Sequence, residues 1–108
     1  MNPEIKSLWV DALRSGKYKQ CRSQLSHSGR YCCLGVLELL AFERDVIEKF
    51  DGDRPYLSPA VAEWAGLGIE NTNPKLGSAA DDNEHSAGWL NDNRGDFIQI
   101  ADRIERYL

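Results

Sequence analysis

The chain has 108 residues, of which 42% are hydrophobic and 28% are charged, and its formal net charge is −4. This length suits one domain rather than two, and the composition excludes a chain that is disordered throughout. No apolar run approaches the roughly 20 residues that a membrane-spanning helix needs, and the N-terminal segment mixes charges among its apolar residues, unlike a secretory signal. We therefore expect a single globular domain over residues 1–108 that lies in the cytoplasm and contacts no membrane.

The charge is divided unevenly along the chain. Residues 1–30 contain six basic and two acidic residues, whereas residues 31–108 contain seven basic and fifteen acidic ones. A domain that coats nucleic acid is usually basic over its whole surface, so duplex DNA is not an expected partner. The basic first third leaves room for one local anion-binding patch.

The first helix has a clear beginning and end. Asn2 can cap the helix, Pro3 suits its first position, and Glu4 favours the positive end of the helix dipole. Gly16 supplies a left-handed stop. Five apolar residues between these ends recur with helical spacing and predict one buried face: Ile5, Leu8, Trp9, Ala12 and Leu13.

Helical periodicity is absent from residues 17–30, where polar and basic residues interleave with Tyr18, Cys21 and Leu25. The sequence Ser-His-Ser-Gly at 26–29 is typical of a turn. These features predict a short irregular hairpin whose second strand ends at residues 31–32. The apolar run over 32–42 then predicts a helix buried on every side. Gly35 weakens such a helix by about 1 kcal/mol relative to alanine, so we expect another segment to lie close against it.

The second half of the chain contains fewer apolar residues. A polar connection over 43–56 leads to a helix that opens at Ser58-Pro59 and ends at Gly66. Residues 67–85 suit a long loop or a weak hairpin, and residues 87–90 a short helical turn. The last helix begins near Asp96. The expected fold class is α+β, with about four helices around one buried central helix and one or two short β-hairpins.

Two clusters could carry metal or acid–base chemistry. The spacing of Cys21, His27, Cys32 and Cys33 is irregular for a zinc site. Buried thiols without a metal are the better interpretation of the three cysteines. The acidic loop that contains Asp81, Asp82, Glu84 and His85 lacks the spacing of a calcium loop. Nucleophile turns, phosphate loops and dinucleotide fingerprints are also missing from the sequence. We therefore expect no catalytic residues, no metal and no cofactor, and we do not expect an enzyme.

The basic segment is the best candidate for a binding surface. Charged donors bind phosphate, amides read base edges, and tyrosine rings stack on bases. The same composition also suits a basic hairpin that is only solvated. The candidate ligand-binding residues are Lys17, Tyr18, Lys19, Gln20, Arg22, Arg30 and Tyr31.

Five segments carry a resemblance to a known group of proteins. They are GKYKQ (16–20), RYCCLGVLELLA (30–41), LSPAVAEWAGL (57–67), NP (73–74) and LND…FIQIADRIERYL (90–108). Together they resemble an uncharacterised family of short proteins encoded by phages and prophages. That family often has glycines where this chain has Cys21 and Ser23. It has no settled activity from which site residues could be transferred.

The resemblance implies an accessory role in countering bacterial defences, within the cytoplasm of the host cell. The leading hypothesis is a non-enzymatic protein that binds an anionic ligand and sequesters a nucleotide immune signal, a second subunit being one way of completing its site. The alternative is an inhibitor that binds a host defence protein through its acidic surface. A DNA-binding regulator is the least favoured, because the C-terminal segment resembles only the first half of a helix-turn-helix.

Overall fold

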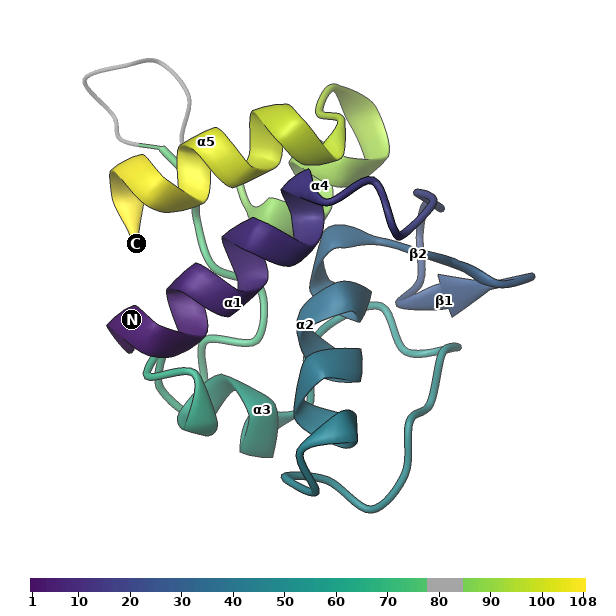
Figure 1. The fold of residues 1–108 in the computed structure, drawn as a ribbon, viewed down its shortest axis with the longest axis vertical. Helices are drawn as coiled ribbons and strands as arrows, with labels where there is room; N and C mark the ends of the chain where they lie inside the picture. The colour runs from purple at the N-terminus through teal and green to yellow at the C-terminus, as the bar shows by residue number, and fades with distance from the viewer. Residues whose placement is uncertain (78–84) are drawn as a thin grey trace.

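The computed structural model describes residues 1–77 and 85–108 and confirms the α+β class (Figure 1). The described residues contain five helices rather than about four, since residues 87–90 belong to a longer helix, together with one two-stranded antiparallel sheet. None of these helices is long and apolar enough to cross a membrane. In chain order the elements are α1 (Pro3–Arg14), β1 (Ser26–His27), β2 (Arg30–Tyr31), α2 (Cys33–Glu43), α3 (Pro59–Trp64), α4 (Ala87–Asn93) and α5 (Phe97–Tyr107).

Helix α2 is the buried centre of the molecule, as its apolar run predicts. Residues 33–38 are all buried. The prediction fails at Phe42, whose side chain is 38% exposed. The expected close contact at Gly35 exists, because a Cβ atom placed there would lie 1.8 Å from the carbonyl oxygen of Leu25. The absence of a side chain therefore lets the segment before β1 cross directly over α2.

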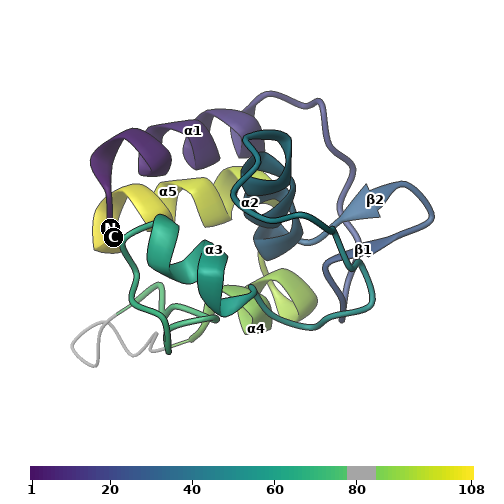
Figure 2. The ribbon, with the colours of Figure 1, turned by 90° about the horizontal axis from the view of Figure 1, so that it is seen from below.

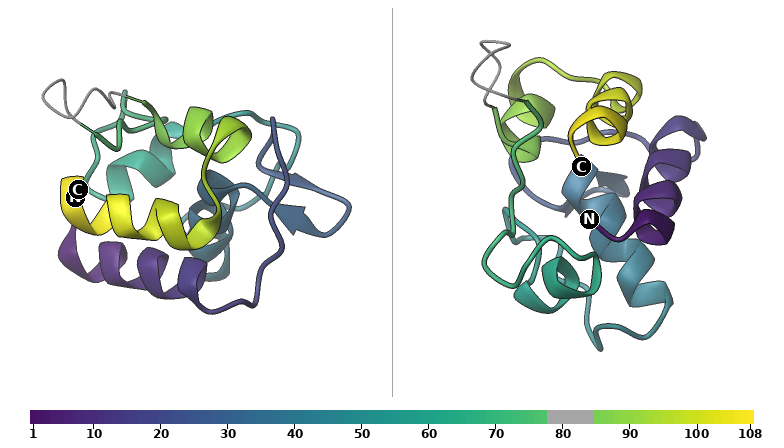
Figure 3. Two further views of the ribbon diagram at one scale, coloured as in Figure 1. Left: turned by 90° about the horizontal axis from the view of Figure 1, so that it is seen from above. Right: turned by 90° about the vertical axis from the view of Figure 1, so that its left-hand side faces the viewer.

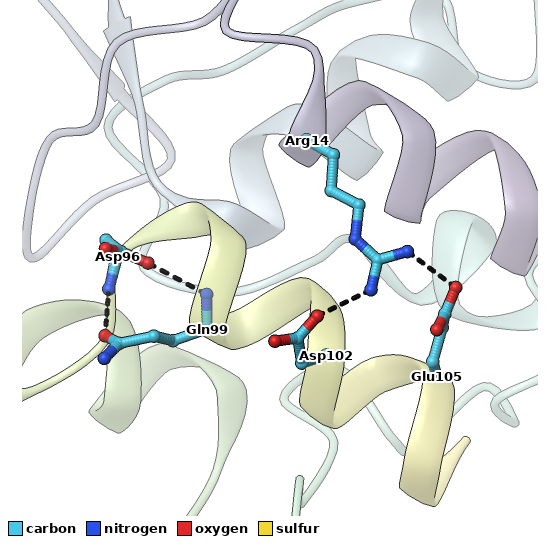
Figure 4. Close-up of polar contacts among 5 residues, drawn as sticks. All are labelled: Arg14, Asp96, Gln99, Asp102 and Glu105. Atoms are coloured by element: carbon cyan, nitrogen blue, oxygen red, sulfur yellow. Dashed lines mark hydrogen bonds and ion pairs between the residues drawn. The ribbon is translucent and has the colours of Figure 1, made fainter.

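Helices α1 and α5 lie side by side and antiparallel, so that the two chain ends meet (Figures 2 and 3). Arg14 of α1 donates to the carboxylates of Asp102, at 2.6 Å, and Glu105, at 2.7 Å (Figure 4). Helix α5 begins at Asp96, as predicted, with a reciprocal capping box to Gln99 (Figure 4). Such local pairs satisfy backbone donors that the first turn of a helix otherwise leaves unbonded.

The hairpin is smaller than predicted. Ser26 and His27 form β1, and the turn consists of Ser28 and Gly29 alone, both with positive φ (51° and 76°). Two such residues suit the tight turn that matches strand twist. The second strand ends at Tyr31. Cys32 instead caps α2, where its sulfur accepts a hydrogen bond from the Gly35 N–H.

Helix α3 begins at Pro59 as predicted, but Ser58 does not cap it with its side chain. The Ser58 N–H donates instead to a carboxylate oxygen of Glu38, at 3.0 Å. Glu38 is only 2% exposed. It interrupts the apolar run of α2 because it links that helix to the start of α3.

The connections between the helices largely follow expectation. Val46, Ile47 and Phe50 lie half-buried against the core in the segment after α2. The segment before α4 forms one antiparallel bridge between Lys75 and Ser86. The acidic loop residues Asp81, Asp82 and Glu84 lie outside the described residues.

Candidate functional site

The structure brings together two of the four cationic candidate residues, Lys19 and Arg30, at the hairpin. A parallel β-bridge joins Gln20 to Tyr31, so the residues that precede these two, Lys19 and Arg30, are neighbours. Arg30 in turn pairs with His27 of β1. Lys19, His27 and Arg30 are all exposed. We call Lys19 and Arg30, which His27 adjoins, the cationic row. These two charged side chains form a local positive surface.

The two candidate tyrosines contact each other. Tyr18 and Tyr31 meet edge to face with their ring centroids 5.7 Å apart, and Tyr31 also contacts Phe50 in the same way at 6.0 Å. The Lys17 ammonium lies 5.4 Å from the Tyr18 ring centroid. Both tyrosines are half-buried, so these contacts fix the hairpin against the segment that follows α2.

Gln20 and Arg22 turn toward α4. The Gln20 amide donates to the Asn91 side chain at 2.8 Å and to the Gly95 carbonyl at 2.8 Å. Arg22 donates to the Asn91 carbonyl at 2.9 Å. These two candidates therefore connect the basic segment to α4, apart from the cationic row.

Asn91 is the buried centre of that connection and was not predicted. Its side-chain oxygen also accepts the Cys33 N–H at 3.0 Å, at the start of α2. Its side-chain nitrogen donates to the Cys21 carbonyl at 2.8 Å and to Asp92 at 3.1 Å. One fully buried amide thus joins the basic segment, α2 and α4.

The three cysteines are free thiols whose surroundings disfavour the thiolate. Burial raises the pKa of Cys32 to about 11 and that of Cys33 well above its ordinary value, and it also raises the pKa of Cys21. The Cys33 sulfur lies 3.5 Å from the Ala87 carbonyl, to which its S–H donates. The thiolate is the reactive form of cysteine, so these residues are suited to packing rather than to nucleophilic attack.

A prediction about alkylation follows from these raised pKa values. In the native protein at mildly alkaline pH, iodoacetamide should leave Cys32 and Cys33 unmodified and react slowly with half-buried Cys21. All three should react once guanidinium chloride unfolds the chain. Peptide mass spectrometry measures each site. Rapid native alkylation of Cys33 would contradict the buried position of its thiol.

Ser23 has a left-handed backbone, with φ of 70°. Its N–H donates to the Asp92 carboxylate at 2.8 Å, which holds the segment against α4. This conformation costs a non-glycine residue roughly 1–2 kcal/mol.

Replacing Ser23 by glycine should therefore stabilise the protein, by about 1 kcal/mol, because the left-handed strain is removed. Chemical denaturation measures the change. Ser7→Gly is the matched control, since Ser7 is exposed within α1 and glycine there should destabilise the protein. Destabilisation by both variants would show that the Ser23 side chain contributes more than its backbone strain costs.

A polar pocket lies beside the basic segment. It has a volume of about 310 Å³, and its wall includes two aromatic residues, Tyr56 and Trp89, and the carboxylate of Asp92. Tyr56 is 47% exposed, whereas Trp89 is held by a parallel stack on His85 with centroids 3.7 Å apart. The remaining wall includes the amides of Gln24, Asn73 and Asn93.

Arg22 lies close to this pocket. It precedes Ser23, which lines the pocket, and it bonds to the carbonyl of Asn91, which precedes the lining residue Asp92. The pocket therefore combines aromatic and hydrogen-bonding side chains, and an arginine adjoins two of its lining residues through Ser23 and Asn91. Tyr56 and Trp89 were missed in the sequence because they come from two segments that only the fold brings together.

The comparisons with known proteins give a family but no activity. No curated protein and no solved structure matches the chain. A family model matches the chain over residues 1–108. The chain therefore belongs to the family described as a domain of unknown function, DUF8296.

Proposed function

We propose that this protein is a non-enzymatic binding protein that captures a nucleotide. The observation that carries the proposal is the pocket lined by Tyr56, Trp89 and Asp92, with Arg22 next in sequence to its lining residue Ser23 and bonded to the Asn91 carbonyl. Nucleobases are held by aromatic contact together with hydrogen bonds to their edges. The pocket volume of about 310 Å³ is at the small end of ligand sites, which suits a base rather than a whole dinucleotide.

The polar wall determines how a base would be oriented. One oxygen of Asp92 already accepts the Ser23 and Asn91 donors. Its second oxygen can accept from the exocyclic amine of a base. The phosphates then lie toward Arg22, whose guanidinium can make charge-assisted bonds beyond the one to Asn91.

The cationic row contributes at longer range. Lys19 and Arg30 present positive charge on the same segment, and such a field raises the local concentration of anions. By its resemblance to short phage proteins, the proposed biological role is sequestration of a nucleotide immune signal. A phage origin and a counter-defence role are parts of this proposal.

Calorimetry with a panel of linear and cyclic nucleotides tests the proposal. Tyr56→Ala should weaken binding about ten-fold or more, since stacking on an aromatic ring contributes about 1–3 kcal/mol per base. Ile69→Ala removes an equally exposed apolar side chain and should leave affinity unchanged. Arg22→Gln should weaken the binding of nucleotides but not that of nucleosides. Absence of binding by every nucleotide at low salt would refute the proposal.

A further inference from the structure

A second hollow lies along α5 and shares no lining residue with the nucleotide pocket. It is an open groove of about 720 Å³, the size of a small-molecule site. The described residues that line it include three arginines, Arg94, Arg103 and Arg106, and one carboxylate, Asp102. We call it the arginine groove. The spacing of the charged residues along α5 explains why arginines gather in this groove.

Helical spacing divides the charges of α5 between two sides. Gln99, Arg103 and Arg106 follow one another at four and three residues, so they lie on one side of the helix and line the groove. Asp102 and Glu105 are drawn toward α1 by Arg14 (Figure 4). Arg14 offsets one of these two negative charges, and the groove, with three arginines against Asp102, keeps an excess of positive charge.

The guanidinium groups of the groove have partners that orient them, and that of Arg106 lies 5.3 Å from the Tyr107 ring centroid. The Arg94 guanidinium carbon lies 5.4 Å from the Trp89 ring centroid, at the end of α4. Arg103 donates from one nitrogen to the Leu76 carbonyl, at 3.1 Å. A guanidinium carries five N–H donors, so one such bond orients Arg103 and leaves donors for a ligand. Preorganised side chains lose less entropy when they bind.

We propose that the arginine groove binds a small phosphoanion with at least two negative charges, of the pyrophosphate class. Three guanidinium groups suit several phosphate oxygens, because each can form paired bonds with an oxyanion. Gln99 adds a neutral amide donor. This binding is independent of nucleotide capture in the Tyr56 pocket.

Inorganic pyrophosphate is the probe. In the unmodified protein, heteronuclear NMR at low salt should show the side-chain N–H signals of Arg94 and Arg103 shifting in a saturable manner. Arg94→Gln and Arg103→Gln should each weaken binding about ten-fold, as expected for loss of a charge-assisted hydrogen bond. Arg103→Lys should also weaken it, because lysine keeps the charge but loses the paired geometry.

Arg44→Gln is the matched control, since exposed Arg44 also donates to one backbone carbonyl, that of Leu40, at 3.1 Å. It should leave pyrophosphate binding unchanged. The proposal is overturned if the Arg94 and Arg103 signals do not move, if Arg44→Gln weakens binding as much as Arg103→Gln, or if citrate binds as tightly as pyrophosphate. If the unmodified protein binds pyrophosphate but no nucleotide, only the proposal of the nucleotide pocket is refuted.

Discussion

Replacing Gly35 by alanine should destabilise the protein by about 3 kcal/mol or more, the upper range for overpacking a core. The new Cβ would lie 1.8 Å from the Leu25 carbonyl oxygen and 2.7 Å from its carbonyl carbon. Both are backbone atoms of a fully buried residue, so the clash is relieved only if the segment before β1 moves away from α2. Urea denaturation measures the loss.

The control for this substitution is Gly88→Ala, within α4. A Cβ atom there would lie 3.1 Å from a side-chain atom of Asn73, which can shift. Alanine is the better helix former by about 1 kcal/mol, so this variant should change stability little or raise it. If Gly35→Ala were as stable as Gly88→Ala, the close crossing of Leu25 over α2 would be wrong.

Replacing Asn91 by alanine should cost about 3–5 kcal/mol. The substitution leaves the Cys33 N–H and the Cys21 carbonyl without their buried partner and releases the Gln20 amide. Each buried polar group left unbonded costs roughly 1–3 kcal/mol. Thermal and chemical denaturation should agree on the loss.

Asn93→Ala provides the comparison on the same helix. Asn93 is exposed and makes one bond, from its amide to the Trp89 carbonyl at 2.9 Å. Its loss should cost less than about 1 kcal/mol, as is usual for an exposed side chain. Equal effects of the two substitutions would show that Asn91 does not hold the basic segment, α2 and α4 together.

Elements with local signals were predictable from the sequence. The caps at Asn2 and Asp96, the stop at Gly16 and the apolar spacing within α1 and α5 each depend on residues within a few positions of one another. The core role of α2 was also predictable, since a helix that is apolar on every side has to be buried. Gly35 indicated a close neighbour, but its identity as Leu25 depends on the tertiary fold.

Buried polar residues could not be predicted in this way. Asn91 follows Leu90 in a polar segment, and nothing near it in sequence indicates that two distant backbone groups, of Cys21 and Cys33, meet at its side chain. Glu38 similarly looked like a break in an apolar run, whereas it accepts the Ser58 N–H. A polar side chain of this kind is explained only by the partners that the fold supplies.

The candidate site was predictable in part. Charge and aromatic content selected the basic segment, and Lys19 and Arg30 do lie together on its surface. Composition gave no indication that Gln20 and Arg22 turn toward α4, or that Tyr56 and Trp89 form a pocket beside them. The arginine groove was missed because α5 holds as many acidic as basic residues, so its net charge gives no signal. The different directions of its arginines and its carboxylates become visible only when helical spacing and the ion pairs of Arg14 are considered together.

The measurement that tests the central proposal most directly is an NMR titration of the unmodified protein with the tightest-binding member of the nucleotide panel. The proposal predicts saturable shifts of the Trp89 indole N–H and of the backbone signals of Ser23, Gln24 and Asp92, which line the pocket. Signals of the exposed residue Ile69 should stay in place. Unchanged signals around the pocket at saturating nucleotide would contradict nucleotide capture at this site.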